Sequence, residues 1–222
     1  MQKQQRINKW VVAAMLAGAS TAAPMAAHAE ISANLSVASQ YLWRGQSLTS
    51  GGALSGGIDY AHDSGLYAGF WTSSEDEKNE YDLYGGYAGS AGSLHYDIGY
   101  TTYWYTEFGG DLNFQEAHLA LGYGAFGVSG HFGVGDYGWG DGAEKNRDNY
   151  YTVSYEYQRF GALLGYYDLD DNDLRYTHLD LSYEVYDGLV FTVSQVIDRA
   201  DDDHPDAVSD NLQFVVSYTF TF

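Results

Sequence analysis

Polar and apolar residues alternate along most of this chain, most clearly at its end. From Phe214 to Phe222 every second position is apolar or aromatic, and all but one of the positions between carry a hydroxyl group. A period of two places alternate side chains on opposite faces of a β-strand. The sequence therefore predicts a terminal strand with one apolar and one polar face.

Eleven further segments have a strand-like pattern, which makes about twelve strands in all. The segments are 31–44, 53–62, 65–73, 80–89, 93–104, 113–123, 126–136, 149–158, 161–168, 174–186, 190–198 and 211–222. Two of them, 65–73 and 161–168, alternate poorly, so the pattern leaves open which of their faces is apolar. The 27 glycines are consistent with many tight turns between strands.

The connections between these segments alternate strictly between short and long. The short ones are His62-Asp63-Ser64, Ser90-Ala91-Gly92, Gly124-Ala125, Arg159-Phe160 and Asp187-Gly188-Leu189. An antiparallel up-and-down β-barrel in a membrane has short periplasmic turns and longer outer loops, whereas a Greek-key sandwich has no reason for this alternation. We therefore predict an all-β, up-and-down transmembrane β-barrel of about 12 strands. A soluble secreted sandwich or jelly roll is the alternative.

The N-terminal 29 residues have the features of a secretory signal peptide. Lys3, Arg6 and Lys9 precede an apolar run, and small residues surround His28 in the motif Ala27-His28-Ala29. The apolar run is shorter than the roughly 20 residues that a membrane-spanning helix needs. We predict cleavage after Ala29, leaving residues 30–222 as a single barrel domain. The chain has no cysteine, so disulfide bonds play no part in it.

The composition is strongly acidic. Thirty Asp and Glu residues, all beyond position 29, compare with ten Lys and Arg residues. This charge excludes binding of nucleic acid through its phosphates. The acidic runs fall mainly in the long connections, 75–77, 168–173 and 198–210. Because the neighbouring lipopolysaccharide is anionic, we expect Ca²⁺ or Mg²⁺ to associate loosely with these loops, although simple solvation of the acids is the plainer interpretation.

With apolar residues assigned to lipid, the opposite face of the predicted strands is polar and largely acidic. Twelve strands lie between barrels of eight, which are filled by side chains, and those of 16–18, which hold an aqueous channel. We expect a narrow acidic lumen that favours cations and neutral polar solutes over anions. The alternative is a filled interior in which these groups hydrogen-bond to one another. The predicted pore-lining residues are Arg44, Asp59, Asp82, Asp97, Glu116, His118, His131, Glu156, His178, Asp180 and Glu184.

Two histidines of this inward face are predicted to be neighbours. If Gly124-Ala125 is a two-residue turn, His118 lies directly opposite His131, and Glu116 is one step along the same face. Such a group can hold a metal ion, but a hydrogen-bonded pair is the preferred interpretation. The chain has no Gly-x-Ser-x-Gly motif. We expect neither an enzyme nor a bound cofactor.

Several segments resemble known outer-membrane proteins. The terminal Phe with alternating aromatic residues resembles the targeting signal of bacterial outer-membrane barrels. The segments 38–47 (ASQYLWRGQS), 65–74 (GLYAGFWTSS), 81–87 (YDLYGGY) and 97–100 (DIGY) are similar to the TorF family of putative porins. This resemblance implies a Gram-negative outer-membrane channel and assigns no solute or catalytic residue.

The function expected from the sequence is therefore diffusion of small polar or cationic solutes through the outer membrane. The alternative is a closed barrel whose acidic loops bind a cation, a partner or a surface without transport. In the first case we expect Arg44, the main positive group of the lumen, to pair with a wall carboxylate and set the constriction.

Overall fold

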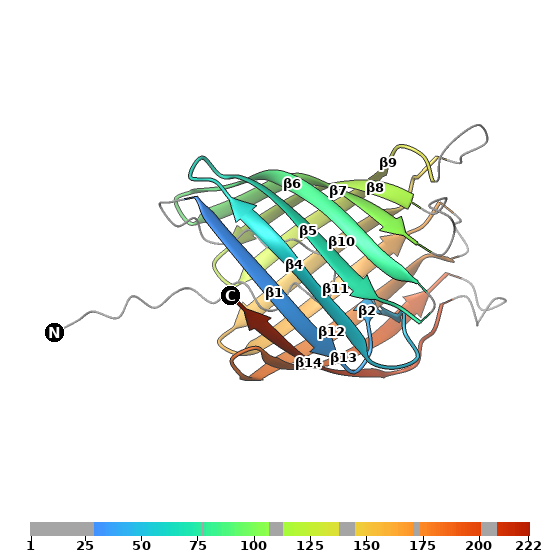
Figure 1. Cartoon of the computed structure of the whole chain (residues 1–222). Coiled ribbons are helices and arrows are strands. Elements are labelled where there is room, and N and C mark those ends of the chain that lie inside the picture. Colours follow the sequence, from blue (N-terminus) through green and yellow to red (C-terminus); the bar gives the residue numbers. More distant parts are fainter. Residues whose placement is uncertain (1–28, 77, 107–112, 138–144, 171–173, 201–207) are drawn as a thin grey trace.

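Twelve strands close into an antiparallel barrel in the computed structural model, which describes residues 29–76, 78–106, 113–137, 145–170, 174–200 and 208–222 (Figure 1). The barrel strands are β1 (Glu30–Ala38), β4 (Ala53–Ala61), β5 (Leu66–Ser74), β6 (Asn79–Ala91), β7 (Leu94–Tyr105), β8 (Asn113–Tyr123), β9 (Phe126–Val134), β10 (Asn149–Tyr157), β11 (Phe160–Asp168), β12 (Tyr176–Tyr186), β13 (Leu189–Arg199) and β14 (Gln213–Thr221). Each barrel strand pairs with its neighbours in chain order. The predicted up-and-down barrel of about 12 strands is confirmed. The predicted signal peptide lies almost entirely at 1–28, outside the described residues, and remains a prediction.

The barrel closes between its first and last strands. β1 pairs with β14 from Asn34 opposite Thr221 to Ala38 opposite Ser217, and with β4 on its other side. Closure leaves neither strand with an open edge, so their backbone N–H and C=O groups are paired within the sheet. The start of β1 and the C-terminus lie at the end of the barrel that carries the short turns (Figure 1).

The short turns lie at or within two residues of the predicted positions. Ser90 and Ala91 of the predicted turn Ser90-Ala91-Gly92 are paired in β6, so that turn is residues 92–93, and Leu189 is paired in β13. Gly124-Ala125 is a two-residue turn, and the register that follows places His118 opposite His131, as predicted. The predicted turn Arg159-Phe160 is wrong by one residue, because Phe160 is paired in β11 and the turn is Gln158-Arg159. Gln158 adopts a φ of 57°, which a tight hairpin turn requires.

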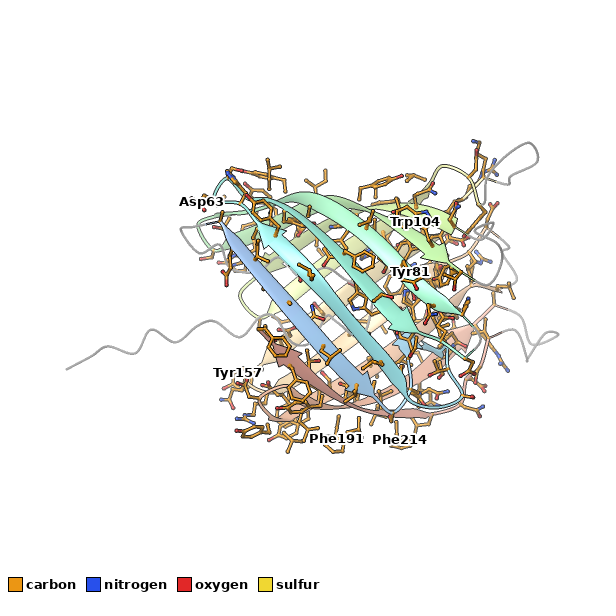
Figure 2. The ribbon with its side chains drawn as sticks, viewed as in Figure 1. Asp63, Tyr81, Trp104, Tyr157, Phe191 and Phe214 are labelled. Carbon is orange, nitrogen blue, oxygen red and sulfur yellow. The ribbon has the colours of Figure 1, made fainter. Side chains whose placement is uncertain are left out.

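Apolar side chains cover the outside of the barrel. Ile58, Ile98 and Phe214 are each more than half exposed although they lie within strands, and Figure 2 shows side chains projecting outward around the wall. At the short-turn end the exposed aromatic residues include Tyr123, Phe126, Tyr155, Tyr157, Phe160, Tyr183 and Tyr186. An apolar band bordered by aromatic residues is typical of a barrel in lipid, and it is compatible with a mean hydropathy of −0.33 because inward positions are polar. No helix in the described residues is long and apolar enough to cross a membrane.

The segment 31–44, predicted to be one strand, is two separate elements. β1 ends at Ala38, and β2 (Leu42–Trp43) pairs with β3 (Gln46–Ser47) in a small hairpin at the loop end of the barrel (Figure 1). The turn residues Arg44 and Gly45 have φ values of 48° and 82°. Positive φ at both central residues defines a type I′ turn, whose twist suits a two-residue hairpin. The prediction was wrong because the polar–apolar alternation continues through the point where the chain leaves the barrel wall.

The hairpin supplies part of the buried core of the molecule. Trp43 packs against one cluster of buried residues formed by Tyr150, Tyr167, Tyr176, Val196 and Val208. It also packs against a second cluster, formed by Tyr103, Tyr105 and Phe114. The two clusters come from β7–β8 and from β10–β13. Residues 39–41 and 48–52 connect the hairpin to the wall. The hairpin therefore joins strands on both sides of the lumen at its loop end.

Candidate functional site

A buried ion pair inside the barrel joins the hairpin tip to the wall. Arg44 Nη1 and Nη2 donate to the two carboxylate oxygens of Glu116 on β8, at 2.9 and 2.6 Å. The two side chains are 1% and 2% exposed. Tyr103 also donates to Glu116, at 3.2 Å, and His131 Nδ1 lies 3.9 Å from the same oxygen. A two-pronged guanidinium–carboxylate pair fixes orientation as well as distance.

Aromatic rings enclose the rest of the Arg44 side chain. Its guanidinium carbon lies 4.4 Å from the ring centre of Trp43, 4.5 Å from that of Tyr150 and 4.9 Å from that of Tyr167. These distances are within the range of cation–π attraction, which is strongest where water is excluded. The hydroxyl of Tyr176 donates to the Arg44 carbonyl at 3.0 Å. Both the charge and the backbone of the hairpin tip are therefore held by the wall.

Further contacts secure the hairpin at its base and tip. The amide of Gln46 donates to the carbonyl of Ser209 and accepts from the Ser209 N–H, at 3.0 and 2.9 Å. At the tip, a Cβ built on Gly45 lies only 2.6 Å from Cγ of His178 on β12. Glycine is required there by this close approach as well as by its positive φ.

Two networks of tyrosine, histidine and aspartate lie on the wall beside the ion pair. In the first, His118 Nε2 lies 2.8 Å from Asp97, and the Tyr67 hydroxyl contacts both groups. In the second, His178 lies between Tyr150, at 2.8 Å, and Asp180, at 2.9 Å. Ser194 donates to Asp180 at 2.5 Å. Each aspartate thus has nearby hydrogen-bond donors, which stabilise its burial.

The predicted neighbours His118 and His131 have ring centres 5.6 Å apart. Each ring is directed to a different carboxylate, His118 to Asp97 and His131 to Glu116. Within the described residues, no three or more His, Cys, Asp or Glu side chains are arranged to hold a metal ion. His118 lies within hydrogen-bonding distance of Asp97, at 2.8 Å, whereas His131 Nδ1 lies 3.9 Å from Glu116, which is beyond that distance.

The remaining predicted pore-lining residues also lie on inward positions of their strands. Asp59 accepts a hydrogen bond from Tyr84, and Asp82 is buried. Glu156 and Glu184 are partly buried near the short-turn end. The eleven residues do not form one cluster. Arg44, Glu116 and the three histidines gather around the hairpin, with Asp97 and Asp180 beside two of the histidines. The other four acids, Asp59, Asp82, Glu156 and Glu184, are spread along the wall.

Sequence reasoning missed the groups that hold Arg44. Tyr103, Tyr150, Tyr167 and Tyr176 were not singled out, although each has the inward parity of its strand. In β10, for example, Tyr150 shares its face with the polar position Thr152. An aromatic residue at a polar-face position is the signal that could have found them. Glu80, 1% exposed on β6, was also missed.

The wall opposite the ion pair is not covered by these contacts. A small cavity of about 30 Å³, room for about two water molecules, lies there, bounded by β1, β4, β5, β13, β14 and the chain at 40–41. Its polar lining includes Asn34, Ser36, Ser55, Ser217 and Thr219. The hairpin therefore fills one side of the lumen and leaves space beside the other.

Comparison with known proteins identifies the family and the fold. The chain belongs to a bacterial family described as "Bacterial protein of unknown function (Gcw_chp)", whose model matches residues 21–214. No curated protein matches it significantly. Among solved structures it is similar to the KdgM porin, at 9% identity and a TM-score of 0.51, and to the NanC porin, at 10% and 0.51. Each alignment covers 86% of this chain and 98% of the porin. At this identity the likeness is one of fold.

Proposed function

We propose that this member of the Gcw_chp family is an outer-membrane channel for passive diffusion of small polar solutes, narrowed on one side by its own hairpin. The observation that carries the proposal is the asymmetry of the lumen. Arg44 binds the hairpin to the wall at Glu116, and a small cavity lies along the opposite wall. In the proposed channel the hairpin forms the constriction, and solutes pass along the wall that it leaves uncovered.

The outer surface supports the membrane location. Apolar residues exposed on the strands suit lipid, and closure of the barrel leaves no strand edge inside it. The expected signal peptide agrees with export from the cytoplasm, and the resemblance to the TorF putative porins agrees with a channel. The similar fold of two porins supports the same class of protein.

The lumen is proposed to prefer cations to anions. Its inward acids outnumber Arg44, although Glu116 is neutralised by that residue and Asp97 and Asp180 each have a histidine partner. The outer loops add negative charge at the entrance and are proposed to bind divalent cations loosely. Burial raises the pKa of the Glu75 carboxyl, although Lys78 at 3.2 Å acts in the opposite direction. A raised pKa favours the neutral acid, so Glu75 adds less negative charge than an exposed carboxylate. The acidic residues Glu77, Asp171, Asp173, Asp201–Asp203 and Asp206 lie outside the described residues.

The packing of the hairpin favours a second candidate. Arg44 is almost completely buried among aromatic rings, which is also what a permanently closed barrel would have. In that case the acidic loops would bind a cation, a partner or a surface, and nothing would cross. The two candidates differ in conductance.

The test is single-channel recording of the purified protein in planar bilayers, with a salt gradient to determine ion selectivity. Discrete current steps with a reversal potential of the cation-selective sign support the channel. A barrel that inserts, with heat-modifiable mobility on gels, and gives no steps under any applied voltage would overturn it in favour of the closed barrel.

A further inference from the structure

One carboxylate oxygen of the barrel wall lies between two basic groups. Glu116 Oε2 accepts a hydrogen bond from Arg44 Nη2 at 2.6 Å, and His131 Nδ1 lies 3.9 Å from the same oxygen. Arg44 reaches this oxygen from the hairpin, whereas His131 belongs to β9, the strand that pairs with β8. A neutral histidine at that distance attracts the carboxylate little, but a protonated one is a second cation beside a single negative charge.

The groups that face His131 come from three elements. β8 supplies Glu116 and also His118, whose ring centre lies 5.6 Å from that of His131. β10 supplies Tyr150, which lies opposite His131 in the sheet register, with ring centres 6.0 Å apart. The hairpin supplies Arg44. Glu116 is the one acid among these described neighbours, so Arg44 and a protonated His131 have to share it.

The other two histidines near the hairpin each have an aspartate of their own. His118 Nε2 lies 2.8 Å from Asp97, and His178 Nδ1 lies 2.9 Å from Asp180. A proton on either ring therefore has a carboxylate beside it that takes no part in binding Arg44. His131 differs from both, because the carboxylate beside it is the one that holds the hairpin.

Release of the hairpin changes how readily this part of the wall takes up a proton. In the attached state, Arg44 repels a positive charge on His131 and already neutralises Glu116. Once Arg44 has left, a protonated His131 forms an ion pair with Glu116, so the released state binds more protons than the attached state. By linkage, attachment is favoured at high pH and is lost as the pH falls through the range in which histidine titrates, at roughly pH 6.5.

We propose that His131 is an acid sensor for the hairpin: when protonated it replaces Arg44 as the cation paired with Glu116, and the hairpin leaves the wall. The exchange requires little movement, because His131 Nδ1 is only about 1 Å beyond the length of a charge-assisted hydrogen bond. It also leaves Glu116 paired, whereas an unpaired buried carboxylate is the main cost of losing Arg44. The proposal deepens the proposed channel function and rests on it, since it names the condition under which the constriction opens.

The first test is single-channel recording at about pH 7.5 and about pH 5, on either side of the range in which histidine titrates. We expect the larger current steps of a released hairpin to be about tenfold or more frequent in acid, since each proton taken up shifts the equilibrium by up to about tenfold per pH unit. His131→Gln keeps a polar side chain that cannot be protonated there, and should remove this rise. His62→Gln is the matched control and should keep it, because His62 lies in a short turn and contacts Ser64.

His131→Lys places a permanent positive charge at the same position. It is expected to give, at about pH 7.5, the frequent large steps that the unchanged protein gives only in acid. A merely structural role of His131 would not produce that result. Heat-modifiable gel mobility shows whether each variant is folded, and His131→Gln alone decides the test if the lysine variant does not fold.

A second measurement follows the hairpin without any current. Hydrogen–deuterium exchange of residues 39–52 is measured by mass spectrometry at both pH values and corrected for the intrinsic effect of pH on exchange. In the unchanged protein we expect this segment to exchange faster in acid while β8 does not. In His131→Gln we expect the corrected exchange of the segment to be the same at both pH values.

The failures of the two proposals are distinguishable. Current steps whose size and frequency are the same at both pH values, or a rise in acid that persists in His131→Gln, overturn the sensor and leave the channel. Faster exchange of the hairpin in acid that requires His131, without current steps, supports the sensor and overturns the channel.

Discussion

Replacing Arg44 with alanine would leave the Glu116 carboxylate buried beside the hairpin without its guanidinium partner. It would also remove the cation from the faces of Trp43, Tyr150 and Tyr167. The hairpin would then be held at its tip mainly by the hydrogen bond from Tyr176 to the backbone. We expect the hairpin to leave the wall in this variant while the barrel stays folded.

The size of the effect follows from burial. Removing one partner of a buried ion pair costs about 3–5 kcal/mol, because the other charge stays desolvated and unpaired. With tenfold for each 1.4 kcal/mol, the equilibrium between the attached and released hairpin shifts by roughly two to three and a half orders of magnitude. Release requires only residues 39–52 to move, whereas unfolding requires the loss of every strand pair. The hairpin therefore yields first.

The assay is single-channel conductance and ion selectivity of Arg44→Ala beside the unchanged protein. A released hairpin widens the lumen, so we expect larger current steps. We also expect stronger cation preference, because Glu116 is no longer neutralised. Arg147→Ala is the matched control: it removes the same group from an exposed pair with Asp170 at 3.9 Å. Such surface pairs contribute only about 0–1 kcal/mol, so the control should conduct normally.

A double variant tests whether burial of charge is the cause. Replacing Arg44 and Glu116 together with methionine removes both charges and retains apolar packing, which is often neutral or stabilising for a buried pair. We expect this double variant to conduct more like the unchanged protein than Arg44→Ala does. The reasoning is refuted if Arg44→Ala has the conductance, selectivity and urea unfolding midpoint of the original.

Three further predictions concern the hairpin and the lipid face. Tyr176→Phe removes one hydrogen bond to the hairpin tip, worth about 1 kcal/mol, and should make brief openings roughly five times more frequent in current recordings. Gly45→Ala forces a Cβ against His178 at a positive φ, and should give the enlarged conductance of a displaced hairpin. Ile98→Arg puts a charge on the exposed apolar face of β7 and should cost about 2–4 kcal/mol in urea unfolding from lipid vesicles, against about 0–1 kcal/mol for Tyr123→Arg at the short-turn end.

The barrel could be predicted from the sequence because its determinants are local. A period of two assigns each side chain to a face, and a two-residue turn fixes the register of the strands that it joins. Gly124-Ala125 alone was enough to place His118 opposite His131, which lies thirteen residues later in the chain. The ends of most strands differ from the predicted ones by only one or two residues.

The hairpin could not be predicted by the same reasoning. Tyr41 and Trp43 share the parity of the apolar positions Leu35 and Val37. Whether the chain at 42–43 pairs with the wall or with Gln46 and Ser47 depends on contacts distant in sequence. The Arg-Gly turn is also not a typical signal, because type I′ turns favour Asn-Gly and a positive φ is unfavourable for arginine. The contacts of Arg44 with Glu116 and the aromatic rings compensate for that cost.

Two different parts of the barrel wall hold Arg44 and line the cavity. The groups that hold Arg44 lie on β7–β12, and the cavity is lined by β1, β4, β5, β13, β14 and the chain at 40–41. In the proposed channel, residues on the first wall set the width and the charge of the lumen, and residues on the second border the space beside the hairpin. Sites that share no partner contribute additively to free energies. Arg44→Ala and Trp71→Ala should therefore change the single-channel conductance independently. The double variant should show the product of the two fold-changes, unless release of the hairpin also moves Tyr41, whose ring centre lies 5.8 Å from that of Trp71.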